Sequence, residues 1–96
     1  MSALTVLTGA RDLIAAGWVQ GTSEREVNGQ QCYCSVGAIS QAYHMLPTRR
    51  QRGYSEAMSI LRSVIDDDSV VNWNDHPERT QAMVVAGFDR AIKIAA

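Results

Sequence analysis

The sequence predicts a mainly α-helical protein, namely a small four-helix domain with one β-hairpin packed against the helices. Apolar residues recur at helical spacing in several stretches, and an Asn28-Gly29 pair stands between two extended segments. The hydrophobic fraction is 46% and the charged fraction 20%, as in ordinary globular proteins. We expect residues 1–96 to form a single domain, which at this size buries roughly 60–70% of its unfolded surface.

The first helix and the hairpin are the clearest local features. Apolar residues at helical spacing predict a helix over residues 3–16, and Gly17 suits its C-terminal end. Asn28-Gly29 favours a type I′ turn, which would pair Val27 with Gln30 and Arg25 with Cys32. In this register the cysteines face the helices, and the opposite face carries the following residues: Glu24, Glu26, Gln31 and Tyr33.

Three further helices are expected. Ser35 is the predicted N-cap of the second, which Pro47 ends. The third spans residues 54–65, follows a basic linker and is stopped by three aspartates. Residues 70–74 are expected to be irregular, and a last helix to span residues 76–95. The predicted core consists of Leu7, Ile14, Trp18, Cys34, Ile39, Tyr43, Met58, Leu61, Ile65, Trp73, Val84, Phe88 and Ala91.

The stretch VVNWNDHPERT, residues 70–80, is the densest in polar side chains. Asp75 and Glu78 have the spacing of a capping box, and Pro77 suits a first helical turn. Trp73 would precede this cap as an apolar anchor. Helix initiation leaves Asn74, Arg79 and Thr80 unexplained. Buried polar groups need partners, so the cluster is either a structural lock, which we favour, or a binding site for a small polar ligand.

No metal, cofactor or catalytic residue is predicted. A nominal zinc set is present but poorly spaced: Cys32, Cys34, His44 and His76. Nothing places either thiol beside an imidazole, as nucleophilic catalysis would require. Adjacent same-face strand positions are also too far apart for a comfortable disulfide. Two free thiols, no signal peptide and no transmembrane stretch favour a cytoplasmic protein.

The formal net charge of −1 argues against nucleic-acid and membrane partners. Arg49, Arg50 and Arg52 form the only basic cluster, which keeps nucleic-acid binding as an alternative. The last helix has an apolar arc of roughly 200°, wider than a surface helix needs. Either this helix is central, which we favour, or one flank is exposed. We expect the flank led by Val85 and Ile92 to contribute to self-association or partner binding.

The chain resembles a family of small proteins of unknown function from actinobacteria and their phages. The resemblance covers nearly the whole chain and rests on Gly17-Trp18, Gly29, Cys34-Ser35-Val36-Gly37-Ala38-Ile39, Trp73-Asn74-Asp75, Arg79-Thr80, Phe88 and Ala91-Ile92. It implies a product of a phage or an actinobacterium that acts in a bacterial cytoplasm. The family supplies no activity. The sequence therefore favours a non-enzymatic protein-binding module, with a homodimer or a host factor as partner. A small hydrolase or ligand-binding protein that uses Asn74, Arg79 and Thr80 is the main alternative.

Overall fold

The computed structural model describes residues 2–49 and 51–96. The described residues form five helices and a two-stranded antiparallel hairpin, which confirms a mainly helical fold with one hairpin packed against the helices. The elements are α1 (Ser2–Ala16), β1 (Glu24–Val27), β2 (Gln30–Tyr33), α2 (Ser35–His44), α3 (Gln51–Val64), α4 (Val70–Asp75) and α5 (Gln81–Ala95). The short helix α4 is the one that the sequence pattern did not predict.

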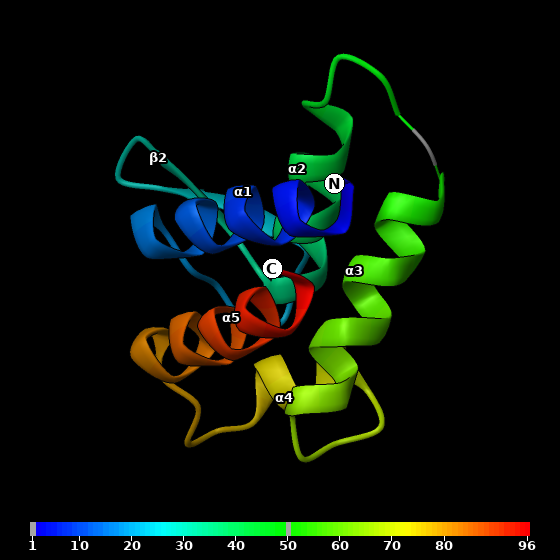
Figure 1. Cartoon of the computed structure of the whole chain (residues 1–96). Coiled ribbons are helices and arrows are strands. Elements are labelled where there is room, and N and C mark those ends of the chain that lie inside the picture. Colours follow the sequence, from blue (N-terminus) through cyan, green and yellow to red (C-terminus); the bar gives the residue numbers. More distant parts are fainter. Residues whose placement is uncertain (1, 50) are drawn as a thin grey trace.

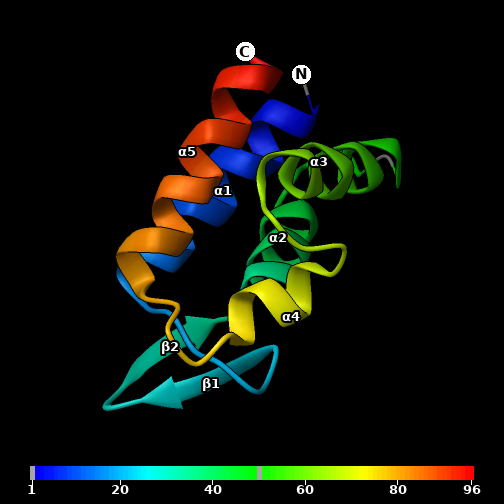
Figure 2. The same ribbon diagram turned by 90° about the horizontal axis from the view of Figure 1, so that it is seen from below.

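Helix α1 occupies the centre of the fold. It packs against α2, α3, α5 and β2, and Val6, Leu7, Ala10 and Ile14 are fully buried there. Helix α5 lies beside α1 and runs in the opposite direction (Figures 1 and 2). The central position predicted for the last helix is therefore wrong, because α5 packs mainly against α1 and α3 and leaves the hairpin to other elements.

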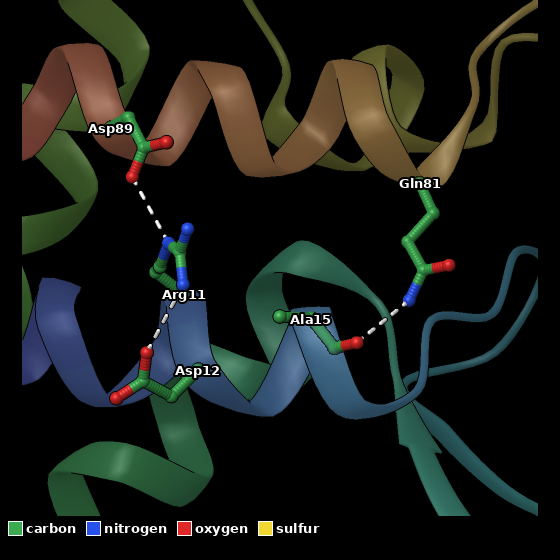
Figure 3. Close-up of polar contacts among 5 residues, drawn as sticks. All are labelled: Arg11, Asp12, Ala15, Gln81 and Asp89. Atoms are coloured by element: carbon green, nitrogen blue, oxygen red, sulfur yellow. Dashed lines mark hydrogen bonds and ion pairs between the residues drawn. The ribbon is translucent and has the colours of Figure 1, made fainter.

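Polar contacts join α1 to α5 along their shared edge (Figure 3). Arg11 Nε donates to Asp89 Oδ1 at 3.0 Å, and this hydrogen bond, with the charge of Asp89, raises the pKa of Arg11. Near the end of α1, Gln81 Nε2 donates to the carbonyl oxygens of Ile14 at 2.7 Å and Ala15 at 3.2 Å. The first side chain of α5 thus satisfies carbonyls that the end of α1 leaves unpaired.

The hairpin has the predicted register, with Val27 opposite Gln30 and Arg25 opposite Cys32. Asn28 and Gly29 both have positive φ, as a type I′ turn requires. One expectation about its faces is wrong, because Tyr33 is buried although it lies opposite the cysteines. Its backbone N–H donates to Gly17 O and its carbonyl accepts from Val19 N, so the segment after α1 pairs with the edge of β2 through a parallel bridge. The turn end of the hairpin projects away from the helices (Figure 2).

The boundaries of α2 and α3 also differ from the prediction. Cys34, not Ser35, is the N-cap of α2, and its Sγ accepts from Gly37 N at 3.3 Å. The helix ends at His44, before Pro47, with Met45 as its C-cap. Helix α3 begins at Gln51, so part of the expected basic linker is helical. Ser35 is released from capping and is buried in the first turn of α2.

The core agrees closely with the predicted residues. Nine of them are buried: Leu7, Ile14, Cys34, Ile39, Leu61, Trp73, Val84, Phe88 and Ala91. Four are partly buried and pack against the core cluster: Trp18, Tyr43, Met58 and Ile65. Small residues that a stripe does not single out, such as Ala38, Ala42 and Ala57, complete the core. Within the described part of the chain, no helix has the length and apolar character needed to cross a membrane.

Candidate functional site

Helix α4 directs Trp73 and Asn74 into the protein. Ser69 begins it as the N-cap, since its Oγ accepts from Asn72 N at 3.1 Å. Asp67 Oδ1 in turn accepts from Ser69 N at 2.9 Å, which holds the approach to the helix. The expectation that residues 70–74 are irregular is therefore wrong. Capping makes a six-residue helix possible, and that helix buries Trp73 and Asn74 on one side.

Asn74 is fully buried, and its amide is saturated with hydrogen bonds. Its Oδ1 accepts from Trp18 Nε1 at 2.8 Å, from Ser35 N at 2.9 Å and from Ser35 Oγ at 2.7 Å. Its Nδ2 donates to Val19 O at 3.2 Å and to Asp75 Oδ1 at 2.9 Å. One side chain thus joins the segment after α1, the start of α2 and α4.

Asp75 ends α4 instead of beginning the next helix. Besides Asn74 Nδ2, its Oδ1 accepts from Gly21 N at 3.1 Å. Gln20 Nε2 strengthens the same junction by donating to Asn74 O at 3.0 Å and to His76 O at 2.8 Å. The capping-box prediction is wrong because the Asp75 carboxylate is already used by a segment more than fifty residues earlier in the chain.

Helix α5 starts five residues later than expected. Residues 76–80 form a turn, in which Arg79 N donates to His76 O at 2.9 Å. Thr80 is the N-cap of α5, and its Oγ1 accepts from Met83 N at 3.2 Å. The expectation that the last helix already includes Thr80 is therefore wrong. Pro77 and Glu78 belong to the turn and not to a first helical turn.

Arg79 lies against Trp73 and is not a hydrogen-bond partner of the Asn74 side chain. Its Nε donates to Trp73 O at 2.7 Å, and its guanidinium carbon is 4.8 Å from the indole centroid. A hydrogen bond and a cation–π contact therefore fix the orientation of the guanidinium. Its terminal Nη atoms have no hydrogen-bond or ion-pair partner among residues 2–49 and 51–96.

A groove adjoins this guanidinium, between the end of α3, α4 and α5. One part has a volume of about 460 Å³ and is lined by Val64, Asp66, Trp73, Arg79, Met83, Ala86 and Arg90. The adjoining part has a volume of about 370 Å³ and is lined by Asp66, Asp67, His76, Glu78, Arg79 and Met83. The two parts share Asp66, Arg79 and Met83, so they lie side by side. We call them together the Arg79 groove.

The structure separates the predicted binding residues. These residues, Trp73, Asn74, Asp75, Arg79 and Thr80, lie close together in the chain. Asn74 and Asp75 nevertheless serve the buried junction, whereas Trp73 and Arg79 line the groove. Thr80 caps α5.

The flank of α5 led by Val85 and Ile92 is half-buried and packs against the core cluster. The more exposed apolar side chains of this helix are Met83, at 44%, and Ile94, at 58%, on the other flank. Met83 also lines the groove, so it is the apolar residue of α5 best placed to meet a ligand there.

Sequence reasoning missed the partners of Asn74 and the far wall of the groove. Trp18, Ser35, Val64 and Arg90 were not candidates, although they hold the junction or line the groove. One signal was available. The indole N–H of Trp18, a predicted core residue, needs an acceptor, and the stretch around Asn74 is rich in acceptors. No sequence signal marked Val64 or Arg90, because their positions depend on how α3 and α5 pack.

The structure does not place together the residues that a zinc site or a Cys–His catalytic pair would need. Cys32 and Cys34 are buried free thiols, whereas His44 and His76 are exposed. In the described ranges, no three His, Cys, Asp or Glu side chains are grouped as metal ligands would be. Of the basic cluster, Arg49 donates to His44 O at 3.3 Å and Arg52 is exposed, and Arg50 lies outside the described residues.

The fold and the buried Asn74 junction define a small, mainly helical protein in which a packed hairpin and a short helix are locked to a central α1. The chain belongs to the Family of unknown function (DUF6197), whose model matches residues 1–94. Neither the curated proteins nor the solved structures compared with the chain gave a match.

Proposed function

We propose that this protein is a non-enzymatic protein-binding module that docks its partner in the Arg79 groove. The observation that carries the proposal is the guanidinium of Arg79, which is fixed on Trp73 while its Nη atoms have no partner among the described residues. A side chain already held in place loses little conformational entropy on binding. Arginine and tryptophan are also the residues that most often dominate the energy of protein interfaces.

The surroundings of Arg79 fit a protein partner. Met83 is exposed and lines both parts of the groove, and Val64 and Ala86 extend the apolar surface. Charged groups surround these apolar residues: Arg90 lines one part, Glu78 lines the other, and Asp66 lines both. An apolar centre with a polar rim is the usual composition of a protein interface.

The hydrolase alternative has less support. It needs Asn74, Arg79 and Thr80 to act on one ligand. The amide oxygen and nitrogen of Asn74 are already hydrogen-bonded to Trp18, Ser35, Val19 and Asp75. Thr80 caps α5. Arg79 alone is left to bind a ligand. Nucleic-acid binding through Arg49, Arg50 and Arg52 stays a second alternative, disfavoured by the net charge of −1.

We further propose that the partner is a host factor or a second copy of the chain. The protein would act in a bacterial cytoplasm, as an accessory product of a phage or an actinobacterium. The resemblance described above supports this setting.

The test is affinity capture from a lysate of the source cell, with quantitative mass spectrometry of the retained proteins. Two variants weaken the groove, Arg79→Gln and Met83→Asp, and Ile94→Asp is the matched control because Ile94 is an exposed apolar residue of the same helix outside the groove lining. We expect one or a few proteins to be retained by the wild type and by Ile94→Asp, and lost from both groove variants. Circular dichroism confirms that each variant is folded. Equal retention by all four proteins, or none above background, would contradict the proposal.

A further inference from the structure

We infer that the Arg79 groove recognises a linear protein segment of bipolar charge, in which an acidic side chain and a basic side chain flank an apolar one. This inference rests on the proposed function and names the chemistry of the partner. It follows from an unequal distribution of charge along the groove.

One part of the groove is suited to a carboxylate. Two arginines, Arg79 and Arg90, line it beside a single carboxylate, Asp66, which also lines the other part. Among the described residues neither arginine forms an ion pair within 4.0 Å. Arg90 Nη2 donates to Val64 O at 3.4 Å, and its other donors have no partner among the described residues. Two guanidinium groups beside an apolar wall bind a carboxylate better than they would in open water, because the wall lowers the local dielectric.

The other part of the groove is suited to an ammonium or a guanidinium. Asp66, Asp67 and Glu78 line it, and His76 and Arg79 are its other polar residues. Asp67 is engaged with the backbone N–H of Ser69. The carboxylates of Asp66 and Glu78 have no hydrogen-bond or ion-pair partner within the described ranges, so they are available to a cationic side chain.

Met83 is the apolar residue that lines both of these parts, which sets the order of the three recognition elements. An apolar side chain over Met83 would leave its acidic neighbour at the Arg79–Arg90 part and its basic neighbour at the Asp66–Glu78 part. A second copy that presents the same face is a poorer occupant, because two hollowed faces placed together leave both grooves unfilled. A segment that enters the groove satisfies both the shape and the charge.

The test measures binding of short synthetic peptides to the full chain by fluorescence anisotropy at low and at physiological salt. Each peptide carries one Glu and one Lys on either side of a Leu, with different numbers of neutral residues between them. Matched peptides have Glu replaced by Gln, Lys replaced by Leu, or both. The protein variants are Arg79→Gln, Asp66→Asn with Glu78→Gln, and the control Arg62→Gln, an exposed arginine of α3 outside the groove lining.

We expect at least one bipolar peptide to bind and its affinity to fall as salt rises. Replacing its Glu should weaken binding on the order of tenfold in the wild type and in Arg62→Gln, and have little further effect in Arg79→Gln. Replacing its Lys should weaken binding to a similar degree in the wild type and in Arg62→Gln. It should have little further effect in the variant that combines Asp66→Asn with Glu78→Gln.

Three outcomes would overturn the inference. Binding of all peptides with equal affinity, still lost in Arg79→Gln, would keep the groove as a docking site and reject the bipolar segment. No binding of any peptide, while lysate capture still depends on Arg79 and Met83, would reject it in favour of a folded partner surface. Sedimentation that shows a dimer dissolved by Arg79→Gln would identify a second copy as the occupant.

Discussion

Trp18 Nε1 donates to Asn74 Oδ1 at 2.8 Å across a sequence separation of 56 residues. This hydrogen bond joins the segment that follows the central helix α1 to the short helix α4. The same oxygen also holds Ser35 at the start of α2, so three distant segments share one acceptor. Because Ser35 is fully buried and Trp18 is partly buried, these donors depend on Asn74 for a partner.

We predict that Asn74→Ala lowers the free energy of unfolding by about 3–5 kcal/mol, because it leaves several buried donors and the Val19 carbonyl without partners. Urea denaturation followed by circular dichroism measures the loss. Asn72→Ala is the control, since Asn72 lies on the same helix and is exposed. A loss no larger than that of the control would show that Asn74 does not hold the junction.

Gly37 lies where the backbone of the hairpin entry touches α2. A Cβ at this position would overlap the Ser23 carbonyl oxygen and would lie 2.9 Å from the Ser23 carbonyl carbon. That oxygen also accepts from Cys34 N at 3.0 Å, so it cannot move without loss of a hydrogen bond. Gly37→Ala should therefore destabilise the protein by about 1–3 kcal/mol or more, against the usual benefit of Ala in a helix.

The matched control for Gly37→Ala is Ser40→Ala on the same helix, where we expect a change within about 0.5 kcal/mol. Thermal denaturation of both variants separates the effects. If Gly37→Ala were as stable as the wild type, the close approach of Ser23 would be incorrect.

Thr80, not Asp75, should behave as the N-cap of the last helix. Thr80→Ala removes the acceptor of Met83 N and should cost about 1 kcal/mol, whereas Thr80→Ser should restore most of it. Glu78→Ala should be close to neutral, because Glu78 lies in the turn before the helix. A reversed order, with Glu78→Ala the more costly, would revive the capping box.

The ion pair between Arg11 and Asp89 is exposed, with side-chain exposures of 37% and 52%. Its loss in Asp89→Asn should lower the melting temperature slightly at low salt and not at about 1 M salt, where screening is nearly complete. Asp68→Asn is the control, because Asp68 is exposed and forms no ion pair with the described residues. A large, salt-independent loss would mean that Asp89 has a packing role.

The pH dependence of this pair follows from the raised pKa of Arg11. A raised folded-state pKa stabilises the protein while the group is charged, and this contribution disappears only when the pH rises through that pKa. Arginine is charged far above neutral pH, so Arg11 should add no slope to stability around neutrality. A stability profile of wild type and Asp89→Asn across the neutral range checks this, and profiles that diverge there would contradict it.

Val85 and Ile92 provide a direct test of which flank of α5 is core. Val85→Asp with Ile92→Asp should unfold or strongly destabilise the protein, because both side chains pack against the core cluster. Met83→Asp should leave it folded, since Met83 is 44% exposed. If the double variant stayed folded and lost a partner or a dimer, the flank predicted from the helical arc would be an interface.

Periodicity and turn chemistry in the sequence determined the helical class, the hairpin register and most of the core. These signals are local: Asn28-Gly29 requires positive φ whatever surrounds it, and an apolar stripe must be buried somewhere. Leu7, Ile14, Ile39 and Phe88 were therefore predictable as core residues. The free cysteines were predictable as well, since strand geometry alone separates Cys32 from Cys34.

Tertiary structure decided where the 70–80 stretch is helical and what its polar residues do. Its local pattern favours a helix start at Asp75. In the fold, helices begin instead after Ser69 and after Thr80, because the Asp75 carboxylate meets Gly21 N and the Asn74 amide meets Trp18, Val19 and Ser35. Those partners come from chain segments that local propensity cannot relate, and satisfying buried polar groups outweighs the worth of a single helix cap.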